Sequence, residues 1–360
     1  MRLLICAGGT GGGVYPALAV HSALTSRISD VDTLWVGGEG GMEETLVKRQ
    51  GIAFRSIPAA GVHGVGLLTL PRNLALLGRG VLAARRILNE FQPHVMFFTG
   101  GYVAVPVALA GRSIPIMLYV PDIEPGMALK SLAGFADVIA VTTEESQKFF
   151  NKKVYVTGYP LRADLALWDR QTAHLHLGIS GELPVLLVFG GSKGARSINL
   201  AVLNNLRDLL QKFEVIHLTG EQDWQMVRHA REQLPMEYAA RYHALPYLHE
   251  MGAALAAADL VVSRAGASCL GEFPLFGLPA VLVPYPHAWR YQKVNADYLT
   301  RRGAAVILED HRLNNELMIT LNILMENPNK LKAMRAAMFE LSHPRAADRI
   351  ASALVELAGE

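Results

Sequence analysis

The chain has 360 residues, of which 51% are hydrophobic, and this is enough to bury two cores of roughly 150 to 200 residues each. Its 34 basic and 32 acidic side chains leave a net charge of +2, far too little to argue for nucleic acid binding. Cys6 and Cys269 provide neither a disulfide framework nor a metal-ligand cluster, so a reducing cytoplasm is expected.

Two stretches bear on targeting. The apolar run at residues 3–7 ends in glycines, too soon for a secretory signal peptide. Residues 95–111 are uncharged, but Gly100, Gly101 and Pro106 interrupt them before they could cross a bilayer. We therefore expect a soluble protein that at most rests on a membrane.

Short apolar runs alternate with helix-like stretches, which predicts parallel sheets with crossover helices. A hinge-like Gly158-Tyr159-Pro160 separates two series, so we expect two domains, residues 1–160 and 161–343. The helical stretch at 344–358 is predicted to pack back on the first domain. The expected strands are residues 3–7, 33–37, 53–58, 94–99, 114–120, 138–142 and 154–157, then 185–189, 214–218, 242–245, 260–263, 280–284 and 304–308.

This pattern predicts an α/β fold of two doubly wound Rossmann-like domains whose parallel sheets face each other across a cleft. Glycine-rich turns follow the first strand of each series: Gly8-Gly9-Thr10-Gly11-Gly12-Gly13 and Gly190-Gly191-Ser192-Lys193-Gly194-Ala195. Each turn precedes a helix, so each places backbone N–H groups where an anion could bind. Neither turn has a P-loop ending, and the first lacks the full dinucleotide fingerprint. Tight turns that simply need glycine are the alternative.

The helical stretch within residues 64–91 carries more leucines than one buried stripe needs. Its predicted inward stripe is Leu74, Leu77, Val81, Ala84, Leu88 and Phe91. The surplus Leu67, Leu68, Leu70 and Leu76 lie beside Arg72, Arg79, Arg85 and Arg86. This combination favours contact with an anionic membrane surface, and burial against a neighbouring loop is the alternative.

Four segments resemble signature segments of the MurG family, inverting GT-B glycosyltransferases that add N-acetylglucosamine to lipid-linked muramyl-pentapeptide in peptidoglycan synthesis. They are GGTGGGVYPALAV (8–20), TGGYVAVPVALA (99–110), GGSKGARSIN (190–199) and SRAGASCLGEFPLFGLPAVLVPYPHAWRYQKVNADYL (263–299). The resemblance spans nearly the whole chain. It implies a UDP-sugar donor on the second domain, a polyprenyl-linked acceptor on the first, and a peripheral position on the cytoplasmic face of the bacterial membrane.

The resemblance also implies a set of donor-binding residues. Ser192, with the N–H groups around Gly191 and Gly194, and Arg264 would hold the diphosphate, a role that a helix N-terminus and an arginine can fill. Glu272 would accept the ribose hydroxyls, although a charge that complements the helix dipole is the alternative. Tyr291 stands where the family has the first of two sugar-reading glutamines, and Gln292 is the second. The other implied donor residues are Thr10, Gly11, Gly12, Arg162, Leu248 and Met251, the last two around the uracil.

The acceptor side departs from the family pattern. Gly13 replaces a histidine, and Tyr119-Val120-Pro121-Asp122 replaces His-Glu-Gln-Asn, whereas Thr10 and Tyr102 are retained. Gly13, Gly100, Gly101 and Tyr102 are the implied acceptor contacts. Asp122 and Glu124 are the candidate bases because they follow a strand in a proline-bounded loop, and ordinary turn carboxylates are the alternative.

The predicted reaction is a single displacement with inversion. An acceptor hydroxyl attacks the anomeric carbon, a carboxylate takes its proton, and UDP leaves toward N–H groups and arginine. No cofactor or metal is expected, and Asp30-Val31-Asp32 is interpreted as a solvated loop. The altered acceptor side leaves two alternatives: a GT-B transferase with a different lipid-linked acceptor, and an inactive UDP-sugar-binding protein.

Overall fold

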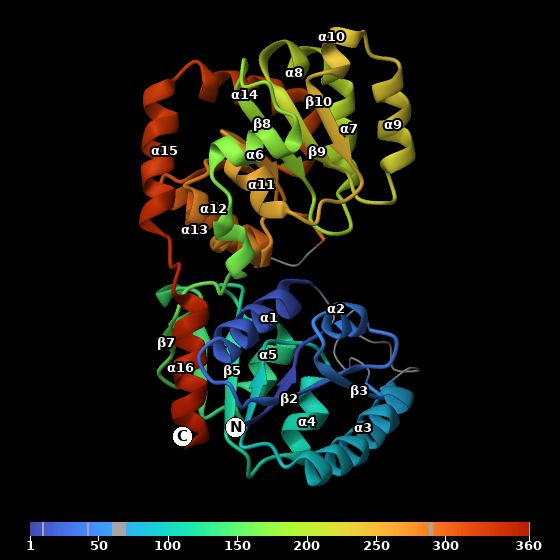
Figure 1. Cartoon of the computed structure of the whole chain (residues 1–360), viewed down its shortest axis with the longest axis vertical. Coiled ribbons are helices and arrows are strands. Elements are labelled where there is room, and N and C mark those ends of the chain that lie inside the picture. The colour runs from blue at the N-terminus through green and yellow to red at the C-terminus, as the bar shows by residue number, and fades with distance from the viewer. Residues whose placement is uncertain (9–10, 42, 60–69, 288–290, 360) are drawn as a thin grey trace. The chain divides into compact units, whose positions relative to one another are not determined.

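The computed structural model describes residues 1–8, 11–41, 43–59, 70–287 and 291–359. The chain divides into two compact units, Met1–Arg162 with His343–Glu360, and Ala163–Ser342 (Figure 1). Each unit has its own parallel sheet with helices on both faces, the architecture expected from the alternating pattern.

The first unit is built on a seven-stranded sheet in the order β3-β2-β1-β4-β5-β6-β7. Side chains of β1 alternate between two cores: Leu4 and Cys6 pack with α3 and α4, and Leu3 and Ile5 pack with α1 and α16. The strands are β1 (Arg2–Cys6), β2 (Asp32–Gly38), β3 (Ala53–Ile57), β4 (Val95–Phe98), β5 (Ile116–Val120), β6 (Val138–Val141) and β7 (Tyr155–Val156). The helices are α1 (Gly11–Thr25), α2 (Glu43–Arg49), α3 (Leu70–Phe91), α4 (Ala104–Ala110), α5 (Met127–Leu132), η1 (Glu144–Phe149) and α16 (Ala346–Ala358).

The second unit repeats this plan with a six-stranded sheet in the order β10-β9-β8-β11-β12-β13. Its strands are β8 (Val185–Phe189), β9 (Glu214–Leu218), β10 (Tyr242–Leu245), β11 (Leu260–Ser263), β12 (Ala280–Leu282) and β13 (Ala305–Ile307). Its helices are η2 (Ala163–Leu167), α6 (Arg170–Leu177), α7 (Arg196–Asn204), α8 (Leu206–Lys212), α9 (Trp224–Glu232), α10 (Met236–Ala239), α11 (Met251–Ala257), η3 (Ala267–Leu270), α12 (Glu272–Phe276), α13 (Tyr291–Arg301), η4 (Asp310–Arg312), α14 (Leu313–Met325) and α15 (Pro328–Glu340).

All the expected strands are present, and their ends differ from the prediction by no more than two residues. In both sheets the order reverses beside the first strand of the series, between β1 and β4 and between β8 and β11. Doubly wound sheets bind ligands at the carboxyl ends of the strands next to such a reversal. The two glycine turns follow β1 and β8, at these positions.

The last helix, α16, belongs to the first unit although it follows the second unit in sequence. Ile350 and Leu354 are buried in the same core as β1 and α1. Arg27 Nη1 in the turn after α1 donates a 2.7 Å hydrogen bond to Ser352 Oγ, and Arg27 Nη2 lies 3.4 Å from Asp348 Oδ1. The apolar face of α16 therefore completes the first core.

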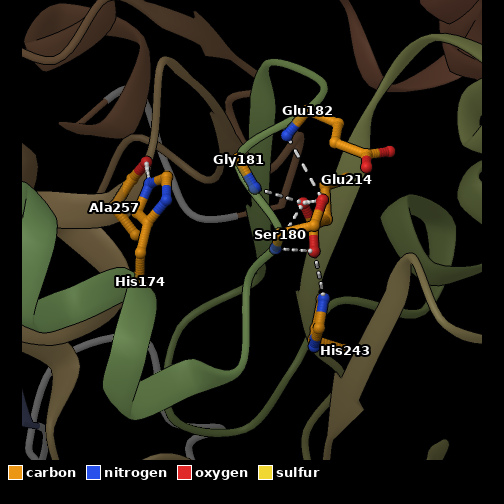
Figure 2. A network of polar contacts seen from close by, with 7 residues as sticks. All are labelled: His174, Ser180, Gly181, Glu182, Glu214, His243 and Ala257. Carbon is orange, nitrogen blue, oxygen red and sulfur yellow. Dashed lines mark hydrogen bonds and ion pairs between the residues drawn. The ribbon is translucent and has the colours of Figure 1, made fainter.

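The amino-terminal edge of the second sheet is held by a buried carboxylate (Figure 2). Glu214, at the start of β9, accepts hydrogen bonds from the Ser180 and Gly181 backbone N–H groups and from the Ser180 hydroxyl, and pairs with His243 Nε2 at 3.0 Å. Burial raises the pKa of Glu214, but these donors outweigh burial and bring the pKa below its ordinary value. The contact anchors the connection between α6 and β8, away from the glycine turn.

Candidate active site

The second glycine turn (residues 190–195) joins β8 to α7 with its tip in solvent. Gly191 and Gly194 have φ values of +90° and +77°, a region that favours glycine. Gly191, Ser192 and Lys193 are exposed. Within the described residues, Ala195 at the N-cap of α7 provides no side-chain cap, so the first-turn N–H groups of α7 have no such acceptor. Gly194 N already donates to Gly191 O at 2.9 Å, and binding of an anion by the other N–H groups of the turn stays a prediction.

Arg264 follows β11, the strand next to β8, and it is mostly buried with 10% of its side chain exposed. Its guanidinium donates to Ser197 Oγ at 2.8 Å and to Val283 O at 3.2 Å, and it is ion-paired with Asp310 Oδ1. The guanidinium also lies 5.1 Å from the centre of the Tyr285 ring. Arg264 thus links β11 to the first turn of α7 and to η4, and a contact with the donor diphosphate stays a prediction.

The other donor candidates of the second unit follow the carboxyl ends of neighbouring strands. Glu272 is the first residue of α12. This position is compatible both with binding of the ribose hydroxyls and with a charge that complements the helix dipole. Leu248, between β10 and α11, and Met251, the first residue of α11, are partly exposed rather than core. Tyr291 and Gln292 begin α13, and Gln292 Oε1 accepts a 2.9 Å hydrogen bond from Tyr285 N. All of these residues belong to the same edge of the second sheet as the second glycine turn.

The first unit brings its candidate residues to the equivalent edge of its own sheet. Gly11, Gly12 and Gly13 form the first turn of α1, and Thr99 Oγ1 after β4 donates a 2.7 Å hydrogen bond to Gly13 O. Gly100 and Gly101 have φ values of +133° and +91°, and a Cβ on Gly101 would lie 3.1 Å from Gly8 O. The implied contact Tyr102 is exposed, whereas Thr10 lies outside the described residues.

Arg162, predicted to lie near the nucleotide, belongs to the first unit. Its guanidinium lies 5.3 Å from the centre of the Tyr15 ring on α1, in the turn that follows the glycines. The first-unit glycines and Arg162 are therefore gathered around the N-terminal end of one helix. Their contact with the donor stays a prediction.

The two candidate bases have different surroundings. Asp122 is half-buried, and its charge adds to burial in raising the pKa of Tyr119, whose hydroxyl is 2.7 Å from Thr142 Oγ1. Glu124 has only 5% of its side chain exposed, and its Oε1 lies 3.5 Å from Lys130 Nζ. Asp122 is therefore the more accessible of the two, and Glu124 has a cation as partner.

Sequence reasoning missed Glu43, a third carboxylate at this edge. Glu43 begins α2, is only 2% exposed, and accepts a 3.0 Å hydrogen bond from Gly38 N at the end of β2. A Cβ added to Gly8 or Gly41 would overlap its side chain, and a Cβ added to Gly37 would lie 3.0 Å from its Cγ, so glycines surround it. The run Gly37-Gly38-Glu39-Gly40-Gly41 directly after a predicted strand was the available signal.

Helix α3 corrects part of the predicted stripe. Ala84 and Leu88 are buried as expected, but Leu74 is 52% exposed. Gly80, with no room for a Cβ beside Pro58 O, lets the helix approach its neighbours closely, which turns the buried face toward Gly80, Ala84 and Leu88.

The leucines on the exposed face of α3 are also not all the ones that the sequence predicts. Leu82 is 64% exposed and Leu76 is half-buried, whereas the four predicted basic residues Arg72, Arg79, Arg85 and Arg86 are all exposed. Leu67 and Leu68 lie outside the described residues, as does the side chain of Leu70. Among the helices that the structure describes, none combines the length and hydropathy needed to span a bilayer.

Two doubly wound parallel sheets, each with a glycine turn at its switch point, have the architecture of a GT-B glycosyltransferase. The chain belongs to glycosyltransferase family 28, whose N-terminal domain matches residues 3–141 and whose C-terminal domain matches residues 185–350. The resemblance to the MurG family is confirmed by similarity over the whole chain, both to relatives and to a solved structure.

Two relatives carry the name UDP-N-acetylglucosamine–N-acetylmuramyl-(pentapeptide) pyrophosphoryl-undecaprenol N-acetylglucosamine transferase. The protein from Roseiflexus sp. (strain RS-1) is 39% identical, over 99% of this chain and 95% of its own. The protein from Desulforudis audaxviator (strain MP104C) is also 39% identical, over 100% of this chain and 99% of its own. The crystal structure of Acinetobacter baumannii MurG matches with a TM-score of 0.79 at 26% identity, over 99% of each chain.

Proposed function

We propose that this chain is an inverting N-acetylglucosaminyltransferase that moves the sugar of UDP-N-acetylglucosamine to lipid-linked N-acetylmuramyl-pentapeptide, converting lipid I into lipid II in peptidoglycan synthesis. The observation that carries this proposal is 39% identity over the full chain to transferases of that name. The exposed second glycine turn ahead of α7 supports it, because such a turn suits the diphosphate of a UDP-sugar.

In the proposed reaction a hydroxyl of the acceptor sugar attacks the anomeric carbon from the face opposite UDP. The new C–O bond forms as the bond to the diphosphate breaks, and Asp122 takes the hydroxyl proton. The negative charge that develops on UDP is stabilised by the N–H groups of residues 191–193 and the first turn of α7. Glu272 would bind the ribose, Leu248 and Met251 the uracil, and Tyr291 and Gln292 the transferred sugar.

The proposal needs a UDP-sugar as substrate and no cofactor or metal. Backbone N–H groups and arginine would fill the role that a divalent cation has in other sugar-nucleotide enzymes. Across the described residues, no three or more His, Cys, Asp or Glu side chains gather as metal ligands. Transfer at an undiminished rate in excess chelator is expected, and a loss that Mg²⁺ restores would contradict this part of the proposal.

A second candidate function differs from the first in the acceptor that receives the sugar. Gly13 and residues 119–122 differ from the residues that the family resemblance implies, which favours a GT-B transferase acting on a different lipid-linked acceptor. Transfer of labelled sugar from UDP-N-acetylglucosamine to a lipid-linked muramyl-peptide, compared with other polyprenyl diphosphate sugars, tests both functions. Transfer to the muramyl-peptide alone supports the first, and transfer only to another acceptor supports the second. UDP binding without any transfer would show a binding protein.

The acceptor is membrane-embedded, so the enzyme must reach a lipid surface. We propose that the exposed face of α3 provides this contact with anionic lipid at the cytoplasmic face of the membrane. The face combines four exposed arginines with the exposed Leu74 and Leu82, a composition that suits headgroup phosphates and the outer acyl region.

A further inference from the structure

A chain of buried polar side chains lies beside the second glycine turn. Asn199 on α7, His217 on β9 and Tyr242 on β10 are fully buried, and Asp223 at the N-cap of α9 is nearly so. The Tyr242 hydroxyl is 2.7 Å from His217 Nδ1, and His217 Nε2 is 3.0 Å from Asn199 Oδ1. Asn199 Nδ2 donates to Asp223 Oδ2 at 2.9 Å and to Thr219 O at 2.8 Å. These contacts connect α7, β9, β10 and the N-terminal end of α9.

The hydrogen bonds of this chain run in one direction. Because both amide hydrogens of Asn199 go to acceptors, its Oδ1 must accept, so His217 Nε2 is the donor. His217 Nδ1 then accepts from the Tyr242 hydroxyl. Burial lowers the pKa of His217 to about 3, which keeps the imidazole neutral, as this tautomer requires.

The same amide fixes the backbone under the glycine turn. A Cβ on Gly194 would overlap Thr219 O, and a Cβ on Gly220 would overlap the backbone of Lys193 and Gly194, so the two backbone segments are in direct contact. Thr219 O is the carbonyl to which Asn199 donates. Asn199 lies one turn into α7, the helix that begins where the glycine turn ends. Asn199 therefore connects the backbone of Thr219 and Gly220, which contacts the glycine turn, to the start of α7.

We infer that Asn199, oriented by His217, is a positioning residue for the second glycine turn, and that it aims the N–H groups of the turn at the diphosphate of the sugar nucleotide. The inference rests on the proposed function, because it assigns the turn to the donor. Asn199 acts through the backbone of Thr219 and Gly220 and touches no substrate.

The test compares Asn199, within α7, with the asparagine that caps the C-terminal end of the same helix. Asn205, at the other end of α7, donates to Ala201 O at 2.8 Å and so makes a matched control. We expect Asn199→Ala to weaken UDP binding, measured by calorimetry, and to raise the donor KM, each by about tenfold, with the acceptor KM unchanged. Asn205→Ala should change neither by more than about twofold.

The outcomes separate the inference from the proposed function. A folded Asn199→Ala protein that binds UDP as the parent does would overturn the inference. So would a fall in kcat with both KM values unchanged, since that result indicates only fewer active molecules. If the parent protein itself does not bind UDP, the proposed function fails instead.

A second set of variants covers the case in which Asn199→Ala does not fold. His217→Leu removes the donor to Asn199 Oδ1, whereas His217→Gln keeps an N–H donor of similar reach. We expect the leucine variant to weaken UDP binding and the glutamine variant to restore it to within about twofold. Tyr242→Phe should lower the melting temperature and leave UDP affinity unchanged, because it removes only the hydrogen bond to His217 Nδ1 and leaves the contacts of Asn199 in place. Equal UDP affinity in His217→Leu and His217→Gln would overturn the inference.

Discussion

His217 makes the stability of the protein depend on pH. Its pKa is lowered by burial to about 3 in the folded state, against about 6.5 for an exposed imidazole. Between these two values the unfolded chain binds the extra proton, so the unfolding free energy falls as pH decreases, by about 1.4 kcal/mol per pH unit. Above the unfolded pKa the contribution is complete.

The measurement is urea denaturation of the parent and His217→Gln at a series of pH values from about 7 to about 4. Burial also lowers the pKa values of His21 and His343, so the contribution of His217 is the difference between the two proteins. The parent should lose stability more steeply than the variant below about pH 6. Parallel curves for the two proteins would show that His217 is not the group that titrates.

The candidate bases give a second prediction at this scale. Asp122→Asn should lower turnover by about two to four orders of magnitude with UDP binding retained, as expected for loss of a general base. Glu124→Gln is the matched control, because Glu124 is buried and paired with Lys130, and its effect on turnover should be much smaller. Parental rates in both variants and in the double variant would place the base elsewhere, and Glu43→Gln would be the next variant to test.

Single residues also show what sequence reasoning could not reach. The glycine turns and Asp122 stand out because each follows an apolar strand, and position along the chain was enough to find them. Arg264 was predicted to bind the diphosphate, but its ion pair with Asp310 joins residues 46 positions apart, and only the packed fold shows it. The contact of Asn199 with His217 is likewise a product of how α7 packs on β9.

Helix α3 carries the prediction that belongs to a whole element. Changing Arg72, Arg79, Arg85 and Arg86 to glutamate should abolish sedimentation with anionic vesicles, because like charges then face each other. UDP binding should be intact, since the donor turn belongs to the other unit. A control with the same net charge changes four exposed cations of the second unit, Arg207, Lys212, Lys330 and Lys332.

Vesicle binding by the control and not by the α3 variant supports the proposed membrane face. Equal loss in both proteins would mean that net charge alone governs sedimentation. Equal binding before and after the α3 changes would show that another surface meets the membrane. Leu82→Ser, which removes the most exposed of the leucines whose side chains are described on this helix, should weaken binding while leaving all charges in place.

The elements themselves were largely predictable, and α3 shows where the prediction fails. Strands are short apolar runs bounded by glycine or proline, and burial on both faces of a parallel sheet makes those runs continuous. For α3 the period of the helix and the burial of Ala84 and Leu88 were predicted correctly, but Leu74 lies outside the buried face. Close approach at Gly80 decided which face is buried, and periodicity gives no information about where a helix comes closest to its neighbours.

At the scale of the whole molecule, the chain leaves the first unit at Arg162 and returns to it at His343. The returning helix α16 supplies Ile350 and Leu354 to the first core, whereas Leu317 of α14 belongs to the core of the second unit. The two cores share no side chain in these sets. A destabilising substitution in one core is therefore expected to lower the stability of that unit alone.

Two leucine-to-alanine substitutions, one in each core, test whether the two units are independently stable. Leu354→Ala should lower the unfolding free energy of the first unit by about 2 to 5 kcal/mol, the usual cost of such a cavity, and Leu317→Ala should do the same to the second unit. Hydrogen exchange read by mass spectrometry reports both units in one experiment. In Leu354→Ala the peptides of β1 and β4 should exchange faster while those of β8 and β11 keep their protection, and Leu317→Ala should give the reverse. If either variant speeds exchange equally in both sheets, the units unfold together, and the return of α16 then ties the stability of the first core to that of the second.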